Sequence, residues 1–225
     1  MSPVSVAIDG PAGAGKSTVA KLVAERLKFL YIDTGAMYRA VAYLCVKENV
    51  DCSDTSAVDK LVKEHEFRFE EGRDLGLLVY VDDQDVSAYL RSPDVSERVS
   101  LVAALPEVRS RLTQWQRAFA KTHSVVMDGR DIGTVVLPDA TVKVFLTANV
   151  EERARRRQQE YHERGFDVSL GEIIESMTQR DKLDSERELA PLTSAPDAVH
   201  IDSTGKAIDV VVDEIMRLVE RAHVR

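Results

Sequence analysis

The sequence predicts a three-layer α/β protein, in which a central parallel sheet lies between two layers of helices. Short apolar runs alternate along the chain with longer segments whose apolar residues recur at helical spacing, as in β–α–β units. A glycine-rich segment also joins the first apolar run directly to the first helical pattern. The 225 residues, of which 44% are hydrophobic and 30% charged, suffice for one unit with a substantial core.

Each element of this fold has its own signal. The predicted strands are short apolar runs at Val4–Ile8, Phe29–Asp33, Ser124–Met127, Thr141–Leu146 and Ala198–Ile201. Six helices are predicted. The first carries Val19, Val23 and Leu27, the second spans Ala36–Lys47, and the third begins at Pro106. The fourth runs from the cap Asn149 to Glu163, the fifth from the capping box Ser169/Glu172 toward Leu183, and the sixth spans Ile208–Val219. The site of such a sheet is expected at the carboxyl ends of its strands.

Residues 51–92 interrupt this alternation. Two β-like runs, Glu66–Glu70 and Leu77–Val81, flank a turn at residues 72–76, and Gln84–Tyr89 is a candidate third strand. We therefore expect a small β-rich insertion at about residues 51–92, within a single unit that spans residues 1–225.

Residues 10–17 read Gly-Pro-Ala-Gly-Ala-Gly-Lys-Ser, a complete G-x-x-x-x-G-K-[ST] phosphate-binding loop. The strand before it and the helix after it are the context in which free amide N–H groups bind an anion. Lys16 would reach the β- and γ-phosphates, and Ser17 could ligate Mg²⁺. The pattern indicates a nucleoside triphosphate site, and the alternative is an ordinary glycine-rich turn.

Carboxylates end or follow three of the strands: Asp33, Asp128 and Asp202. After Asp33, Thr34 is expected to cap the next helix and to set Arg39 on its second turn, where both could bind a phosphate. A solvated surface arginine is the alternative there. Asp202 is interpreted as structural or as bordering the adenine site.

The segment Asp128-Gly129-Arg130-Asp131 is a charged tetrad directly after an apolar strand. Asp128 could act on Mg²⁺ through water, Arg130 on the transferred phosphate, and Asp131 on a polar edge of the substrate. A plain turn is the competing interpretation.

Two further segments are rich in charge. Arg180, Asp184 and Arg187 share one helix face, and this segment by itself favours a surface ion-pair ladder. Residues 151–157 hold four arginines, which in a phosphoryl-transfer enzyme would neutralise charge and close over ATP. A solvated face balanced by neighbouring glutamates, or a weak nucleic-acid patch, is the alternative for the second segment.

In these motifs the chain resembles the bacterial cytidylate kinases, the CMP/dCMP kinases of the nucleoside-monophosphate kinase superfamily. The resemblance lies in Ile8–Thr18, Asp33–Arg39, Asp128–Val136 and Ala190–Leu192, and it covers essentially the whole chain. The Asp128–Val136 block together with the long insertion is far more specific than the phosphate-binding loop.

The resemblance implies a P-loop kinase fold, with the insertion on the nucleoside-monophosphate side and a helical, arginine-rich lid at about residues 150–168. It implies direct, Mg²⁺-dependent transfer of the ATP γ-phosphoryl group to CMP or dCMP. The implied catalytic residues are Lys16, Arg130, Asp128, Arg153 and Arg157, with Ser17 at the metal. The implied ATP-binding residues are Gly10, Pro11, Ala12, Gly13, Ala14, Gly15, Lys16, Ser17, Thr18 and Arg156.

The implied CMP-binding residues fall into three groups: Thr34, Arg39, Arg130 and Arg187 at the phosphate; Ser100, Arg109 and Asp131 at cytosine; and Arg180 and Asp184 near the ribose. This arrangement is chemically sensible for cytosine, because a carboxylate can accept from the N4 amino group. The carbonyl at the same position of uracil would be repelled by Asp131.

Bulk properties point to small-molecule substrates. The net charge of −8 disfavours nucleic acid or an anionic membrane surface as a partner. No apolar stretch approaches a membrane span, and the first strand begins almost at once, so we expect a cytoplasmic protein. We also expect a monomer. Cys45 and Cys52 are expected to be reduced.

Two other functions remain open from the residues alone. One is a P-loop kinase with another acceptor, such as UMP, dTMP or a small alcohol like shikimate. The other is a nucleotide-dependent switch or RNA-binding regulator that hydrolyses ATP without an acceptor.

Overall fold

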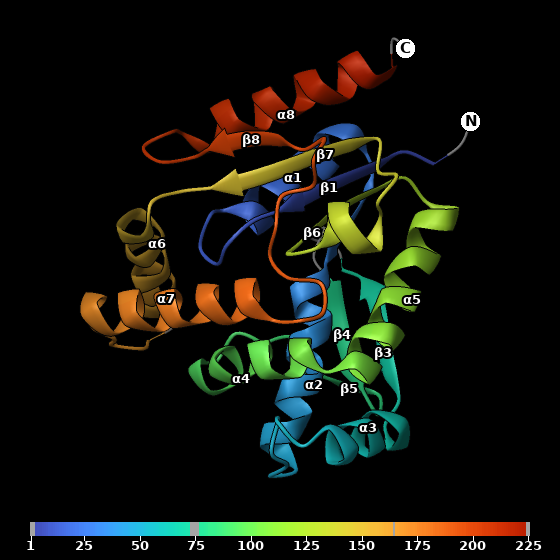
Figure 1. Cartoon of the computed structure of the whole chain (residues 1–225), viewed down its shortest axis with the longest axis vertical. Coiled ribbons are helices and arrows are strands. Elements are labelled where there is room, and N and C mark those ends of the chain that lie inside the picture. The colour runs from blue at the N-terminus through green and yellow to red at the C-terminus, as the bar shows by residue number, and fades with distance from the viewer. Residues whose placement is uncertain (1–2, 73–76, 164, 224–225) are drawn as a thin grey trace.

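The computed structural model describes residues 3–72, 77–163 and 165–223. Its centre is a sheet of five strands in the order β2-β6-β1-β7-β8, and every neighbouring pair is parallel (Figure 1). The strands are β1 Ser5–Asp9, β2 Leu30–Asp33, β6 Val125–Gly129, β7 Val142–Thr147 and β8 Val199–Asp202. The predicted parallel sheet is confirmed.

Helices cover both faces of the sheet, which produces the three layers. The covering helices are α1 Lys16–Leu27 and α8 Ile208–His223 on one face, and α2 Thr34–Lys47 and α5 Pro106–Thr122 on the other. Val6 and Ile8 of β1 lie in the core beneath α1 and α8, whereas Ala7 lies in the opposite core. This alternation follows from the two-residue period of a strand.

The insertion differs from the prediction. Its antiparallel sheet, β3-β4-β5, is present, but a helix precedes it that the sequence did not predict. The elements are α3 Thr55–Glu64, β3 Phe67–Glu71, β4 Leu77–Val81 and β5 Gln84–Asp85. The third strand is shorter than predicted because the chain turns after Asp85, with the Tyr89 amide donating to the Val86 carbonyl. Residues 73–76 of the predicted turn lie outside the described residues.

Two elements around the insertion and β6 were also not predicted. Helix α4, Pro93–Ala104, follows the insertion and has its proline in the first turn, where the missing N–H costs nothing. A single π-helical turn, η1 Ile132–Val136, follows β6. Helix α4 carries residues that line the site, Ser100 among them, and the first two amides of η1 donate to Asp9.

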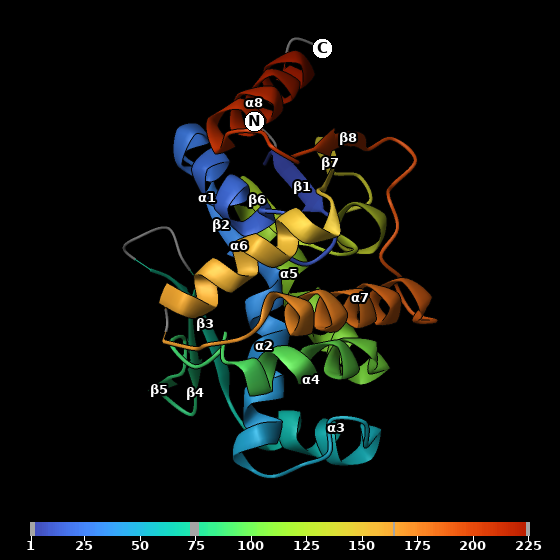
Figure 2. The same ribbon diagram turned by 90° about the vertical axis from the view of Figure 1, so that its left-hand side faces the viewer.

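Two further helices, α6 Val150–Glu163 and α7 Leu170–Glu186, complete the surroundings of the site. Their predicted starts are confirmed: Asn149 Oδ1 accepts from the Glu152 amide at 2.7 Å, and Ser169 and Glu172 form a capping box. Helix α7 lies between α6 and α4 (Figure 2). Within the described residues, no helix combines the length and apolarity that crossing a membrane requires.

Candidate active site

A cavity of about 750 Å³ opens at the carboxyl ends of the central strands. Its wall combines the glycine-rich loop, the starts of α1 and α2, the end of β6, and faces of α4, α6 and α7. All of the sequence-predicted site residues line it except Gly10, Pro11 and Arg153. The fold therefore brings together residues that lie far apart in the sequence.

The glycine-rich loop needs its first glycine. Gly10 has a φ of +148°, and a Cβ there would lie 1.9 Å from the backbone oxygen of Leu146. Lys16 folds back over the loop, and its Nζ donates to the Pro11 carbonyl at 2.7 Å. Burial, and then the charge of Arg130, lower the pKa of Lys16 well below its ordinary value. A bound phosphate would supply the negative charge that favours the ammonium form.

Asp128 lies near the end of β6, beside the start of α1. Its Oδ2 accepts from Ser17 Oγ at 2.9 Å, and its Oδ1 accepts from the Tyr31 hydroxyl at 2.8 Å. Burial, and then the charge of Asp33, raise the pKa of Asp128. Mg²⁺ takes oxygen ligands, commonly one or two carboxylates together with substrate phosphates and water. The oxygens of Ser17 and Asp128 fit the metal that the loop motif implies.

Asp33, not Thr34, caps α2. Asp33 Oδ1 accepts from the Ala36 amide at 2.9 Å, and Oδ2 accepts from Arg39 at 2.7 Å and Arg91 at 3.0 Å. Burial alone would raise the pKa of Asp33, but the two guanidinium groups bring it below its ordinary value. Thr34 Oγ1 donates instead to the backbone carbonyl of Asp128 at 2.7 Å. The prediction that Thr34 caps this helix is wrong, because the carboxylate of Asp33 already accepts from the free amide of Ala36.

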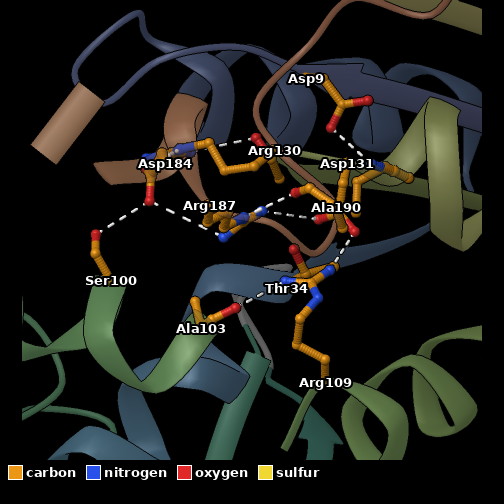
Figure 3. Close-up of polar contacts among 12 residues, drawn as sticks. Asp9, Thr34, Ser100, Ala103, Arg109, Arg130, Asp131, Asp184, Arg187 and Ala190 are labelled. Atoms are coloured by element: carbon orange, nitrogen blue, oxygen red, sulfur yellow. Dashed lines mark hydrogen bonds and ion pairs between the residues drawn. The ribbon is translucent and has the colours of Figure 1, made fainter. Parts of the chain in front are cut away.

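The α5 side of the cavity is an ion pair between buried side chains. Asp131 pairs with Arg109 of α5, and Arg109 also donates to the Ala103 carbonyl at 3.1 Å (Figure 3). Arg187 approaches the same carboxylate, with Nη2 3.7 Å from Asp131 Oδ1. Burial raises the pKa of Asp131 against these two arginines.

A second carboxylate, Asp184 of α7, completes this network. Arg130 Nε donates to its Oδ2 at 2.9 Å, and Ser100 Oγ donates to its Oδ1 at 3.1 Å (Figure 3). Burial would raise the pKa of Asp184, but Arg130, Arg180 and Arg187 bring it below its ordinary value. Asp184 is only 3% exposed. The surface ion-pair ladder is therefore wrong for this helix face, because α4 and the β6 turn cover it.

Three arginines of the cavity each hold a buried nitrogen that has no hydrogen-bond partner: Arg39 Nε, Arg180 Nε and Arg187 Nη2. Burial, and then the charge of Arg130, lower the pKa of Arg180 to about 9. Buried donors without partners cost free energy. All three residues line the cavity, and their positive charge suits a phosphate there.

The arginines of α6 differ in orientation. Arg156 and Arg157 line the cavity. Arg153 is 7% exposed, and its guanidinium donates to the Ala12 carbonyl at 2.9 Å and pairs with Asp181 at 2.7 Å. In the structure Arg153 thus holds the outer side of the glycine-rich loop and does not face the cavity.

Sequence reasoning missed three polar residues near the site: Asp9, Tyr31 and Arg91. Asp9 accepts from the amides of Ile132 and Gly133 at 2.8 and 2.7 Å, and burial raises its pKa to about 6. Its signal was present, because Asp9 ends an apolar strand as Asp33 and Asp128 do. Tyr31 contacts Asp128 because of the register between β2 and β6. Arg91 contacts Asp33 from the end of the insertion. No local sequence pattern reveals either contact.

Known proteins resemble the chain along almost its whole length. The family model described as cytidylate kinase matches residues 6–221. The cytidylate kinases of Bacillus cereus (strain B4264) and Bacillus anthracis (strain CDC 684 / NRRL 3495) are each 50% identical over 216 residues, which cover 96% of both chains. A solved structure of an uncharacterized protein from Eubacterium ventriosum has a TM-score of 0.54 at 14% identity, with 96% of this chain and 98% of that chain covered. That last likeness is one of fold alone.

Proposed function

Because the chain belongs to the cytidylate kinase family, we propose that its cavity transfers the γ-phosphoryl group of ATP to CMP or dCMP. The products are ADP and CDP or dCDP, so the chain is a nucleoside-monophosphate kinase. One observation carries the assignment of roles. The glycine-rich loop and the arginines Arg39, Arg130 and Arg187 line one cavity, so a triphosphate and an acceptor phosphate could bind there together.

At the donor end, amides of the glycine-rich loop bind the phosphates of ATP, and Lys16 leaves the Pro11 carbonyl to contact them. Ser17 and Asp128 would hold Mg²⁺, whose contribution when bound is to neutralise phosphate charge. Arg156 and Arg157 of α6 line the same cavity; Arg156 is assigned to ATP and Arg157 to the transferred group. Positioning and charge neutralisation supply the acceleration, and no covalent enzyme intermediate is needed.

At the acceptor end, the 5′-phosphate binds among Arg39, Arg130 and Arg187, which line the cavity. Asp131 accepts from the cytosine N4 amino group, while Ser100 and Arg109 donate to the ring. Thr34 contributes a hydroxyl beside the phosphate, and Arg180 and Asp184 lie near the ribose. Arg109 pairs with Asp131 and Arg130 with Asp184, and the substrate would take over part of that pairing.

Two segments would close over the substrates: the insertion at about residues 51–92 and the lid at about residues 150–168. Closure excludes water until the acceptor is bound.

We further propose that the protein acts as a monomer in the cytoplasm and binds no nucleic acid. Light scattering after size-exclusion chromatography tests the monomer.

A coupled ADP-release assay tests the function across acceptors. CMP and dCMP should support the highest rates with ATP and Mg²⁺, and UMP, dTMP and shikimate far lower ones. A higher rate with UMP or dTMP would reassign the acceptor. ADP release that is independent of any acceptor would favour the ATP-hydrolysing switch.

A further inference from the structure

Tyr31, a buried residue of β2, donates its hydroxyl to the carboxylate of Asp128 in β6. Tyr31 of β2 is 6% exposed, and its ring lies in the apolar core beneath α1. In the parallel register, Tyr31 is paired with Val126 and Asp33 with Asp128. Since alternate residues of a strand share a face, Tyr31, Val126 and Asp128 all lie on the α1 side. The ring thus extends along the sheet toward the site.

The hydroxyl of Tyr31 and the hydroxyl of Ser17 divide the Asp128 carboxylate between them. Tyr31 donates to Oδ1 at 2.8 Å, and Ser17 donates to Oδ2 at 2.9 Å. The neighbouring Asp33 does not compete for these donors, because Arg39 and Arg91 occupy it. The terminal torsion of an aspartate is intrinsically broad, so two donors fix an orientation that the side chain alone would not keep.

Tyr31 is absent from the residues that line the cavity, so a bound nucleotide would not touch it. Asp128 is 4% exposed, which leaves little room for water to replace a lost donor at Oδ1. Removal of the Tyr31 hydroxyl alone would therefore leave a buried acceptor unpaired. We would then expect the Asp128 side chain to rotate toward Ser17 or away from the sheet.

We propose that Tyr31 is a positioning residue for Asp128: its hydroxyl holds Oδ1 so that Oδ2 stays beside Ser17, toward the metal-bound triphosphate. The inference rests on the proposed function, because it takes Ser17 and Asp128 as the residues that meet Mg²⁺. It assigns no contact between Tyr31 and either substrate.

The test uses Tyr31→Phe, which keeps the ring and its apolar contacts and removes only the hydroxyl. Calorimetric titration with ATP is carried out in EDTA and at a series of Mg²⁺ concentrations. We expect ATP affinity in EDTA to match wild type, and the gain in affinity on adding Mg²⁺ to fall by about tenfold, the effect of losing one hydrogen bond to a charged group. Tyr31→Met, which also fills the apolar site without a hydroxyl, should reproduce this result.

Two comparisons separate positioning from packing. In an Asp128→Ala background, Tyr31→Phe should have no further effect on the Mg²⁺ dependence, as a double-mutant cycle requires. Tyr43→Phe serves as the matched control, because Tyr43 lies on α2, stacks on Tyr89 and does not line the cavity. It should match wild type.

Three results would overturn the proposal: an unchanged Mg²⁺ dependence in Tyr31→Phe, an equal loss with and without Mg²⁺, or the same loss in the Asp128→Ala background. Failure of the proposed function gives a different result. It would appear as wild-type protein that binds ATP and Mg²⁺ but does not phosphorylate CMP.

Discussion

Replacing Asp9 by asparagine should remove one pH dependence from the stability of the protein. Burial, opposed by hydrogen bonds from the Gly133 and Ile132 amides, raises the pKa of Asp9 from 3.8 to about 6. The native state then holds this proton more tightly than the unfolded chain. The resulting stabilisation is fully present below about pH 4 and is lost as the pH rises through about 6. A shift of this size corresponds to roughly 3 kcal/mol.

Urea unfolding of wild type and Asp9→Asn from about pH 4 to about pH 7, followed by fluorescence of Trp115, measures this effect. Asparagine does not titrate and the two proteins share every other group, so the difference between their unfolding free energies isolates Asp9. That difference, wild type minus variant, should fall by roughly 2 kcal/mol between these two pH values, because the unfolded chain already loses part of its protons near pH 4.

Asp197→Asn is a control of opposite sign. Asp197 accepts from Lys143, which lowers the pKa of Asp197. The stability of wild type relative to this variant should therefore be lost as the pH falls, not as it rises. If the difference between wild type and Asp9→Asn stays constant or grows with pH, the burial argument for Asp9 is refuted.

Three further predictions concern the site and the core. Lys16→Met should cut turnover by several orders of magnitude with an unchanged circular dichroism spectrum, since positioned charge supplies most of the acceleration; near-normal turnover would contradict the loop assignment. Asp131→Ala should lower kcat/KM for CMP by about 10- to 100-fold, with calorimetric ATP affinity close to wild type; equal losses for both nucleotides would remove Asp131 from the base site. Ile215→Ala, at a fully buried position of α8, should lower the free energy of unfolding by about 2–5 kcal/mol in urea titrations and leave both KM values unchanged.

The sheet could be predicted because each of its strands is a bounded apolar run, and because the loop motif fixes where β1 ends and α1 begins. The two missed helices also carried local signals. Asp54 caps α3 by accepting from the Ala57 amide, and Val58, Leu61 and Val62 then recur at helical spacing. The β-like runs that follow α3 have the stronger strand signal, so residues 51–92 were predicted to be β-rich. Helix α4 shows the same pattern after its proline.

That most of the motif residues line one cavity could be predicted from the sequence, but the contacts between them could not. Motif residues at strand ends meet because parallel strands end at one edge of the sheet. Which partner each one takes depends on the register between distant segments. Tyr31 and Asp128 lie 97 positions apart, and Arg153 turns to the Ala12 carbonyl because α6 packs against the outside of the loop. Neither contact leaves a local trace in the sequence.

The charge of the cavity explains how an acidic protein can select small anions. The chain carries a net charge of −8, yet among the described residues ten Lys and Arg line the cavity against seven Asp and Glu. A concave surplus of positive charge with low-dielectric walls attracts anions, while the acidic exterior repels them. A mononucleotide can enter such a cavity, whereas an extended polyanion must also lie along the exterior. We therefore expect nucleotide affinity to fall with added salt, and RNA of mixed sequence to bind weakly even at low ionic strength in a filter-binding assay. Tight RNA binding under those conditions would show that the exterior field does not govern access.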